Sequence, residues 1–393
     1  MRRTHAPAIL AALTATTLAH GAGFAIYEWS PSHNATGGTL LGKPLDASAA
    51  WLNPASMTEL PGVQLFMGAS FITRDSTTRI GPYATDFKRE SFLIPGVYAS
   101  MALGDKTRLG FATTTEYGMG TKYPSYWPGK WSNIQTDIQS VTISPTLAHA
   151  VTESLSIGLG PRFVYFDFYN KRDIGVPLIL EGDGWGLGAT ASLYWKVPGT
   201  EDKVTFGLVY RSEVKQEIRG TAHSGLLAYT GRGKACLHLP ASTTGGLNWQ
   251  ATEKLNLGVS ATFTQWSSYD KLFVRINELG RPDDKSWKNV WRFGAGGRYA
   301  VTDALSLMAG YVYDMDPING KHTDYMLPPG DRHILGAGIG YAFSKNWEIS
   351  LGYSFIYMEN RFRIVTAPTG DMVPSKFKDS NAHILSTALA YKF

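Results

Sequence analysis

Several stretches of this chain alternate large apolar residues with small or polar ones, and this two-residue period constrains the fold most strongly. From Trp347 to Phe355 every second residue is large and apolar, and Gly336, Gly338 and Gly340 alternate with apolar neighbours in an earlier stretch. Successive side chains of a β-strand point to opposite faces, so the pattern predicts strands with one face in an apolar phase. A soluble β-sandwich and a membrane barrel both meet that description.

The N-terminus has the features of an export signal. Arg2-Arg3 supply a charged start, Ala8–Leu18 is an apolar and small-residue run, and Ala19-His20-Gly21 places small residues around a cleavage site. We therefore assign residues 1–21 to a signal peptide and expect the mature chain to begin at Ala22. Beyond this segment no apolar run approaches the ~20 residues that a membrane helix needs. An exported chain of this kind is either soluble or crosses a membrane as a closed barrel, in which all backbone groups are paired.

The lengths of the connections between strands favour the barrel. Short turns, such as Gly104-Asp105-Lys106 and Ser344-Lys345-Asn346, alternate with longer polar loops. Short periplasmic turns, longer outer loops, an even strand count and aromatic residues at strand ends are typical of outer-membrane barrels. We predict an all-β, 14-stranded antiparallel transmembrane β-barrel over residues 63–393. The expected strands cover roughly 63–73, 91–103, 107–120, 139–150, 155–169, 184–196, 204–218, 235–250, 255–275, 289–300, 305–313, 333–343, 347–362 and 382–393. The expected outer loops cover 74–90, 121–138, 170–183, 219–234, 276–288, 314–332 and 363–381.

Composition argues against several classes of function. The net charge of +5 is modest and spread along the chain, so no basic patch for nucleic acid is expected. The single cysteine, Cys236, forms neither an internal disulfide nor a metal cluster, and we interpret it as a filler residue in a strand. The G-x-S-x-G and H-E-x-x-H motifs are absent and the histidines are scattered, so we expect no enzyme, no metal site and no cofactor.

Residues 22–62 precede the first strand and do not alternate. Trp29, Trp51, Leu52 and Met57 argue against a disordered tail. A barrel of fourteen strands has a lumen wide enough to need filling or to act as a pore. We therefore predict that residues 22–62 fold into a hatch, or plug, inside the lumen.

The residues between the lipid-facing ones are expected to line the lumen. In strand 155–169 these are Arg162, Val164, Phe166 and Phe168. An apolar patch beside a cation suits an amphipathic acid, so Arg162, Phe166 and Phe168 are candidate ligand-binding residues. Other charged residues are also expected inside, which are Arg292 and Arg298 of strand 289–300 and Arg211, Glu213, Lys215, Glu217 and Arg219 of strand 204–218. The set from Arg211 to Arg219 is interpreted mainly as a self-paired ladder rather than as ligand contacts.

An ordered set of short motifs resembles the FadL/TodX family of outer-membrane transporters for long-chain fatty acids and other hydrophobic compounds. The likeness runs from Ala22 to Phe393, and it is the order of the motifs rather than any single one that is specific. The motifs are Ala22-Gly23-Phe24, Ala49-Ala50-Trp51-Leu52-Asn53-Pro54-Ala55, Glu116-Tyr117-Gly118-Met119-Gly120-Thr121-Lys122-Tyr123, Tyr210-Arg211-Ser212-Glu213-Val214, Pro329-Gly330-Asp331-Arg332-His333 and Tyr391-Lys392-Phe393.

This resemblance implies a path for the ligand. In the family, ligand enters from outside, binds in an apolar pocket and leaves sideways through a gap made by an inward kink of the third strand, which contacts the hatch. Glycine permits such a bulge, and proline fixes a turn. Carried over, Phe24 reaches the bound ligand and the kink with its lateral opening falls near Gly118 and Gly120. The hatch contact falls on Asn53, Pro54 and Ala55.

The function expected from this resemblance is passive uptake of long-chain fatty acids or related lipophiles, with lateral release at the third strand. Two alternatives stay open, which are uptake of aromatic hydrocarbons by the same route and a loop-mediated role as an adhesin or phage receptor. The expected partners are a hydrophobic small molecule, outer-membrane lipids and lipopolysaccharide, and the barrel-assembly machinery, which would recognise the C-terminal Phe393. We expect a monomer in the outer membrane.

One feature departs from the family pattern. Loops 170–183 and 219–234 are short where better-known members fold a surface capture groove. Loop 121–138 carries four aromatic residues that could form an apolar landing surface instead, and anchoring of the barrel at the membrane interface explains them equally well. These residues are Tyr123, Tyr126, Trp127 and Trp131.

Overall fold

The computed structural model describes residues 23–88, 91–224, 229–277 and 279–393, so the expected signal peptide at 1–21 lies outside the described residues. Short helical turns lie mainly in the N-terminal part, and everything else is strand or connection. The helical elements are α1 (Pro31–Ala35), η1 (Leu40–Gly42), α2 (Ala49–Leu52), η2 (Pro54–Glu59), η4 (Trp266–Ser268) and η5 (Gly320–His322). The strands are β1 (Val63–Ile80), β2 (Tyr83–Asp86), β3 (Ser91–Ala102), β4 (Thr107–Thr114), β5 (Gly118–Lys122), β6 (Gln135–Ala150), β7 (Leu155–Asp173), β8 (Pro177–Lys196), β9 (Val204–Arg211), β10 (Val214–Ser224), β11 (Tyr229–Leu239), β12 (Ser242–Gln250), β13 (Leu255–Thr264), β14 (Lys271–Ile276), β15 (Leu279–Asp284), β16 (Val290–Ala300), β17 (Leu305–Asp314), β18 (Arg332–Ala342), β19 (Trp347–Met358), β20 (Arg361–Thr366) and β21 (Met372–Lys392).

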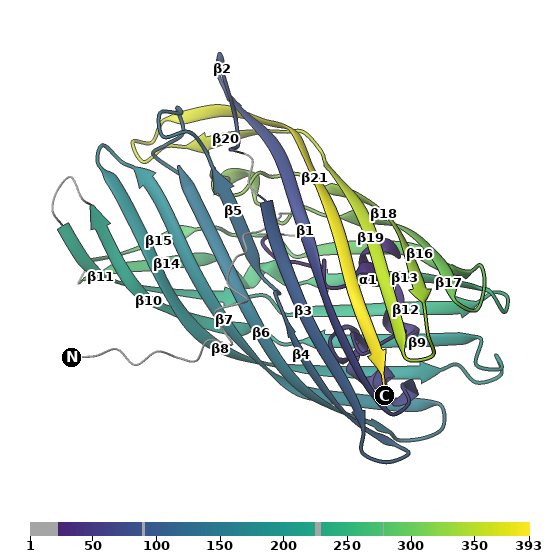
Figure 1. Cartoon of the computed structure of the whole chain (residues 1–393). Coiled ribbons are helices and arrows are strands. Elements are labelled where there is room, and N and C mark those ends of the chain that lie inside the picture. Colours follow the sequence, from purple (N-terminus) through teal and green to yellow (C-terminus); the bar gives the residue numbers. More distant parts are fainter. Residues whose placement is uncertain (1–22, 89–90, 225–228, 278) are drawn as a thin grey trace.

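The strands form one closed antiparallel barrel, because the first strand pairs with the last from Gln64↔Lys392 to Ile80↔Ser375 (Figure 1). Within the described residues, fourteen strands make up the wall, and five of them consist of two labelled segments separated by a bulge or a short irregular stretch. They are β1, β3, β4 with β5, β6, β7, β8, β9 with β10, β11 with β12, β13 with β14, β15 with β16, β17, β18, β19 and β21. The predicted fourteen-stranded barrel is confirmed.

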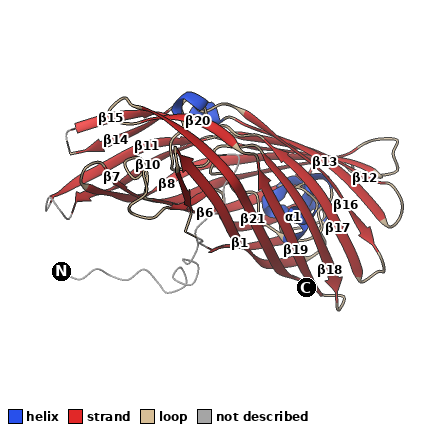
Figure 2. Ribbon diagram, turned by 90° about the horizontal axis from the view of Figure 1, so that it is seen from above, coloured by secondary structure: helices blue, strands red, loops and turns tan. Residues whose placement is uncertain are grey.

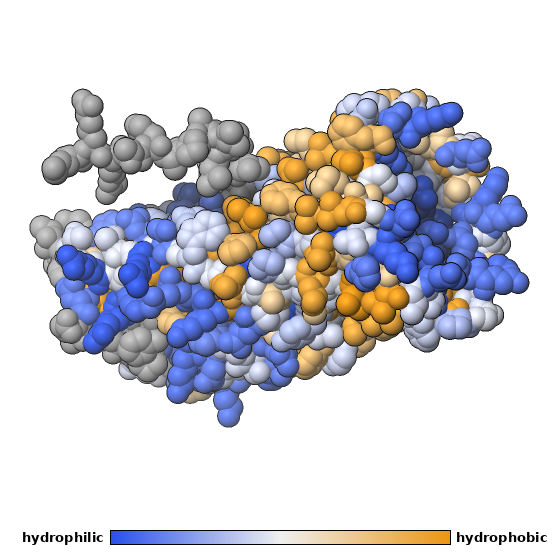
Figure 3. Space-filling model, turned by 90° about the horizontal axis from the view of Figure 1, so that it is seen from below, coloured by the Kyte–Doolittle hydropathy of each residue, from blue (hydrophilic) through white to orange (hydrophobic). Residues whose placement is uncertain are grey.

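The outer surface of the barrel carries the apolar face of the alternating pattern. Trp185, Leu187, Leu335 and Leu385 are all more than half exposed, as are other large apolar residues of the wall. Figure 3 shows apolar residues gathered in a band across the middle of the molecule, with hydrophilic residues on both sides. This band is what the hydrocarbon core of a membrane requires of a barrel. Among the described residues, no helix is long and apolar enough to cross a membrane.

The connections are sorted by length as predicted, but several predicted loops are shorter than expected. The tight turns at 103–106, 151–154, 251–254, 301–304 and 343–346 all lie at the end of the barrel that holds the C-terminus. At the opposite end β7 and β8 continue to Asp173 and from Pro177, so the predicted loop 170–183 is mostly a hairpin. The predicted loop 219–234 is also largely strand. Beyond the membrane both faces of a strand are polar, yet the backbones on the two sides of a turn still pair. Alternation of apolar and polar residues therefore does not reveal these outer parts of the strands.

The predicted strand 204–218 is broken, and the prediction of a charge ladder inside the lumen is wrong. β9 ends at Arg211 and β10 begins at Val214, and the two residues between them reverse the alternation. Arg211 is buried, whereas the side chains of Glu217 and Arg219 are 41% and 76% exposed and pair on the outer surface over 3.0 Å. Glu213 pairs with His238, also outside.

Most of residues 23–62 are buried inside the ring of strands, where α1 is enclosed by the wall (Figure 2), and exposed residues appear only from Glu59 onwards. Lumen-facing glycines of β16 and β17 allow the backbone of this N-terminal segment to come close. A Cβ on Gly296 would lie 2.3 Å from the carbonyl oxygen of Thr36, and one on Gly310 would lie 2.3 Å from its carbonyl carbon. Hydrogen bonds add to the packing, since the backbone N–H of Gly42 donates to Asn248 of β12 over 2.9 Å.

Candidate functional site

The third strand of the wall is interrupted at residues 115–117. β4 pairs with β6 up to Thr114↔Thr142, and pairing resumes between β5 and β6 at Gly118↔Gln139. Three residues of the third strand therefore stand opposite two of β6, which makes a bulge of one residue. Because the inward-facing positions change phase across a bulge, two consecutive side chains, Glu116 and Tyr117, are buried in the lumen.

The wall on the other side of this bulge lacks strand pairing. β3 pairs with β4 only from Val97↔Thr113 to Ala102↔Arg108. Beyond β5, the backbone N–H of Lys88 donates to the carbonyl oxygen of Lys122 over 2.9 Å. Between these two contacts no strand ladder among the described residues joins Ser91–Gly96 of β3 to the third strand. This places an interruption of the wall directly beside the bulge.

The N-terminal segment satisfies the backbone groups that the bulge leaves out of the sheet. Ala25 forms an isolated bridge with Tyr117. The N–H of Gly118 donates to the carbonyl oxygen of Phe24 over 2.7 Å, and the N–H of Ile26 donates to that of Glu116 over 2.9 Å. The two predicted kink residues, Gly118 and Gly120, both lie in β5, and Gly118 is the first residue after the bulge. The bulge itself is at 115–117.

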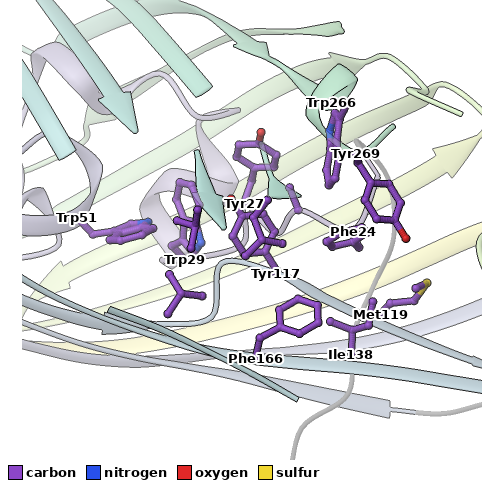
Figure 4. Packing of buried hydrophobic residues seen from close by; sticks show 14 of the residues in the cluster. Phe24, Tyr27, Trp29, Trp51, Tyr117, Met119, Ile138, Phe166, Trp266 and Tyr269 are labelled. Carbon is purple, nitrogen blue, oxygen red and sulfur yellow. The ribbon is translucent and has the colours of Figure 1, made fainter. Parts of the chain in front are cut away.

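Phe24 lies in a cage of aromatic side chains and is only 1% exposed (Figure 4). Its five aromatic neighbours have ring centroids between 4.8 and 6.4 Å from its own, mostly in edge-on arrangements, which aromatic pairs favour. Gly23 adopts a φ of +68°, and a Cβ there would lie 2.5 Å from Trp266, so only glycine fits before Phe24. The five neighbours, here called the aromatic cage, are Tyr117, Phe166, Trp266, Tyr269 and Trp287.

The predicted ligand-binding residues divide between this cage and a buried ion pair. Phe24 and Phe166 meet in the cage, and Phe168 is partly buried and packs against the same apolar cluster. Arg162 is fully buried, but its guanidinium pairs with the carboxylate of Glu116 in the bulge. Its second terminal nitrogen donates to the carbonyl oxygen of Ser212 over 2.6 Å.

The other buried cations near the cage also hold protein acceptors. Arg211 donates to the carbonyl oxygen of Trp51 over 2.5 Å, and its guanidinium lies 4.4 Å from the ring of Trp51. Lys285, whose side chain is 4% exposed, lies 2.7 Å from Asp324 and 2.9 Å from Asp283. Although burial alone would lower it, the carboxylates of Asp324 and Asp283 raise the pKa of Lys285, so this side chain stays charged.

The Asn-Pro-Ala tripeptide lies elsewhere than the resemblance implied. The side-chain amide of Asn53 donates to the carbonyl oxygens of Leu41 and, in β8, Leu193, over 2.8 and 3.1 Å. Pro54 begins η2, and the N–H of Ala55 donates to Ser192 of β8 over 2.9 Å. These hydrogen bonds reach β8, whereas the bulge of the third strand is held by residues 24–26.

The outer mouth of the lumen is covered by two loops that pack on each other. Tyr123 stacks on Trp127 with ring centroids 3.7 Å apart, and the ring of Trp127 lies 4.9 Å from that of Tyr325 in the second loop, 315–331. Tyr123 and Trp127 are therefore buried, and the predictions of a landing surface and of an interfacial anchor are both wrong for these two residues. Of the other aromatics, Tyr126 is 85% exposed and Trp131 is partly buried against Tyr325.

Five residues of the site were not predicted from the sequence, namely Glu116, Tyr117, Trp266, Tyr269 and Trp287. Glu116 lies within a motif quoted for the family resemblance, yet nothing local to it indicates a partner in β7. Trp266 and Tyr269 fall inside the predicted strand 255–275, where the structure has η4 and a break in the strand. A break in alternation at Trp266-Ser267-Ser268-Tyr269 was the available signal.

Comparisons with known proteins agree with this architecture. A family model described as "Outer membrane protein transport protein (OMPP1/FadL/TodX)" matches residues 12–393. The chain is 24% identical to a long-chain fatty acid transport protein of Escherichia coli O6:H1, with 96% of each chain covered. It is 24% identical to the protein of that description from Salmonella typhi, covering 87% of this chain and 89% of the relative.

Among solved structures, a FadL homologue of Pseudomonas aeruginosa superposes with a TM-score of 0.87 at 20% identity, covering 95% of this chain and 100% of that one. The toluene transporter TodX of Pseudomonas putida superposes with a TM-score of 0.75 at 17% identity, covering 94% and 99%. At these identities the structures establish the shared fold, and the family model covers almost the whole sequence. The chain therefore belongs to the OMPP1/FadL/TodX family of outer-membrane transport proteins.

Proposed function

We propose that this protein mediates passive uptake of a hydrophobic compound and releases it sideways into the outer membrane between β3 and β5. The observation that carries the proposal is the missing strand ladder between Ser91–Gly96 and β5, directly beside the bulge at 115–117. Tyr117 of this bulge is also a wall of the aromatic cage. A ligand in the cage would therefore lie next to the interruption of the wall.

In this proposal residues 23–62 act as the hatch that closes the direct route to the periplasm. Supporting it, the segment is almost entirely buried and bonds to wall strands on several sides, including β8 and β12. A ligand that cannot pass the hatch has only the lateral route. Phe24, at the start of the hatch, occupies the cage and would have to withdraw for a ligand to enter it.

The cage supports an uncharged aromatic compound better than a fatty acid. The relatives from Escherichia coli and Salmonella typhi are described as long-chain fatty acid transport proteins, whereas TodX is a toluene transporter. The group that fills the cage here is itself a benzyl side chain, so the space complements one benzene ring. Three cations near the cage, in the described part of the chain, already bind protein acceptors, namely Arg162, Arg211 and Lys285. The carboxylate of a fatty acid in the cage would therefore have to displace one of these acceptors to pair with a cation.

Deleting Thr115 tests the lateral route. The deletion leaves two residues opposite the two of β6, so β4 and β5 can continue as one strand and close the wall. We expect toluene uptake by proteoliposomes to fall at least tenfold, while heat-modifiable migration in gels shows a folded barrel. Deletion of the exposed Tyr126 is the matched control and should leave uptake unchanged. Full uptake by the Thr115 deletion would contradict lateral release.

Ligand identity is tested separately. Mass spectrometry of lipophiles that co-purify in mild detergent, together with competition between labelled toluene and a long-chain fatty acid, distinguishes the two classes. Preferential retention of a fatty acid would overturn the aromatic assignment and leave the lateral route untouched.

A further inference from the structure

We propose that the buried ion pair between Glu116 and Arg162 positions the bulge of the third strand and so keeps the wall open beside β3. Both residues are positioning residues in this account, and Arg162 is not a ligand contact. The proposal deepens the proposed function, because it concerns the same interruption of the wall.

Glu116 and Tyr117 are consecutive residues whose side chains are both buried in the lumen. In an unbroken strand Glu116 and Tyr117 would point to opposite faces. The one-residue bulge turns both into the lumen, where Tyr117 forms part of the aromatic cage and Glu116 pairs with Arg162. In the register that continues Val97↔Thr113, a straight strand would carry Tyr117 to the lipid side and draw the backbone of Glu116 back into the line of the wall, away from the position from which its carboxylate reaches Arg162. Withdrawal of the carboxylate would leave a buried guanidinium without its partner.

Arg162 is a fixed partner for Glu116 because both of its terminal nitrogens are bound. It projects from β7 and is 0% exposed. One terminal nitrogen holds Glu116, and the other holds the carbonyl oxygen of Ser212 at the break between β9 and β10. Gly188 of β8 leaves room for this fork, since a Cβ there would lie 3.1 Å from the second nitrogen. Arg162 thus joins two interruptions of the wall, at 115–117 and at 212–213, through a fixed planar group.

The carboxylate of Glu116 has a second partner besides Arg162. Glu116 is 5% exposed, and its second oxygen accepts from the hydroxyl of Thr142 on β6 over 3.3 Å. Its backbone carbonyl meanwhile accepts from Ile26 of the hatch. The side chain therefore spans the lumen face of β6 to reach β7, and the bulge is held from its side chain as well as from its backbone.

A cysteine pair reports straightening of the third strand directly. Extending the register of Val97↔Thr113 along an unbroken strand would place Leu93 opposite Tyr117, with both side chains on the outer face. In the kinked structure Leu93 is 39% exposed, whereas Tyr117 is 3% exposed and lies in the lumen against Phe24. With the native Cys236 replaced by serine, Leu93→Cys and Tyr117→Cys should form a disulfide readily only when the strand has straightened.

We expect Glu116→Gln and Arg162→Gln to raise the rate of disulfide formation at least tenfold over the parent cysteine pair. Asp314→Asn is the matched control, because Asp314 is fully buried and its ion pairs, with Arg292 and Arg332, join β16, β17 and β18 rather than the third strand. It should leave the rate unchanged. The double variant Glu116→Gln/Arg162→Gln leaves no lone buried charge, so it should insert even where a single variant fails, with the same rise in rate.

An unchanged disulfide rate in the double variant would overturn the proposal, whatever its effect on uptake. An equal rise in Asp314→Asn would also overturn it, because loss of any buried ion pair would then loosen the wall. A raised rate with normal uptake would support the positioning role and count against lateral release, so the two proposals fail separately.

Discussion

The ring of Phe24 packs edge-on against the indole of Trp266, with ring centroids 4.8 Å apart. The side chain of Phe24 thus occupies the space that a ligand would fill. A binding site occupied by part of its own chain has an apparent affinity reduced by the fraction of time that it is free. Phe24→Ala should therefore bind toluene at least tenfold more tightly than the parent protein, as measured by equilibrium dialysis in detergent.

Phe24→Leu provides the control for this comparison, because leucine refills much of the vacated space. It should lie between the parent protein and Phe24→Ala. Equal affinity in all three proteins would show that Phe24 and the ligand occupy different places.

Gly310 of β17 provides a way to displace the hatch without touching the outer wall. A side chain there would collide with the backbone of Thr36, because even a Cβ would lie 2.3 Å from the carbonyl carbon. Gly310→Leu should shift the segment and admit small hydrophilic solutes, measured as faster swelling of proteoliposomes in a sugar solution. Gly245→Leu is the control, since the nearest atom to its Cβ would be 3.8 Å away. A swelling rate unchanged by Gly310→Leu would argue against residues 23–62 as the barrier.

The barrel and its family could be predicted because their signals are local or ordered along the chain. The alternation from Trp347 to Phe355 needs no partner to be recognised, and the structure has β19 over Trp347–Met358. The break between Arg211 and Val214 gives no such signal, since alternation on either side of it fits a strand in either phase. Only contacts with Arg162 and the glycines of β8, far away in sequence, determine which phase is used.

Some residues of the site could be predicted from the sequence, but the contacts between them could not. Arg162, Phe166 and Phe24 were each assigned to ligand contact, and the structure brings Phe24 and Phe166 together. Arg162 and Glu116 are 46 residues apart and lie on strands separated by β6, so their pairing depends on the order of strands in the wall. A lone arginine in a sequence looks the same whether it is free to bind a ligand or already held by a carboxylate.

Lys285 fastens the outer loop 315–331 and gives a prediction about access to the lumen. Its ammonium contacts Asp324 of that loop and Asp283 beside its own turn. Lys285→Met would leave two carboxylates without their shared cation, so the loop should detach and become cleavable by an added protease at least tenfold faster. Lys321→Met is the control, because Lys321 is exposed in the same loop. Equal cleavage of both variants would mean that the ion pair does not hold the loop.

Asp316, in the same outer loop, gives a prediction about pH. Burial raises the pKa of Asp316 to about 6 from an ordinary value of 3.8, although Arg363, 3.8 Å away, opposes the shift. Between these two values the folded loop binds a proton that the detached loop has released, so the packed state loses stability as pH rises through this window. The shift corresponds to roughly 3 kcal/mol between pH 4 and pH 7. Hydrogen exchange in residues 315–331, corrected for the intrinsic rate, should therefore show stronger protection at pH 4.5 than at pH 7. Asp316→Asn has no proton to lose and should show equal protection at both values, and the same flat profile in the parent protein would contradict the prediction.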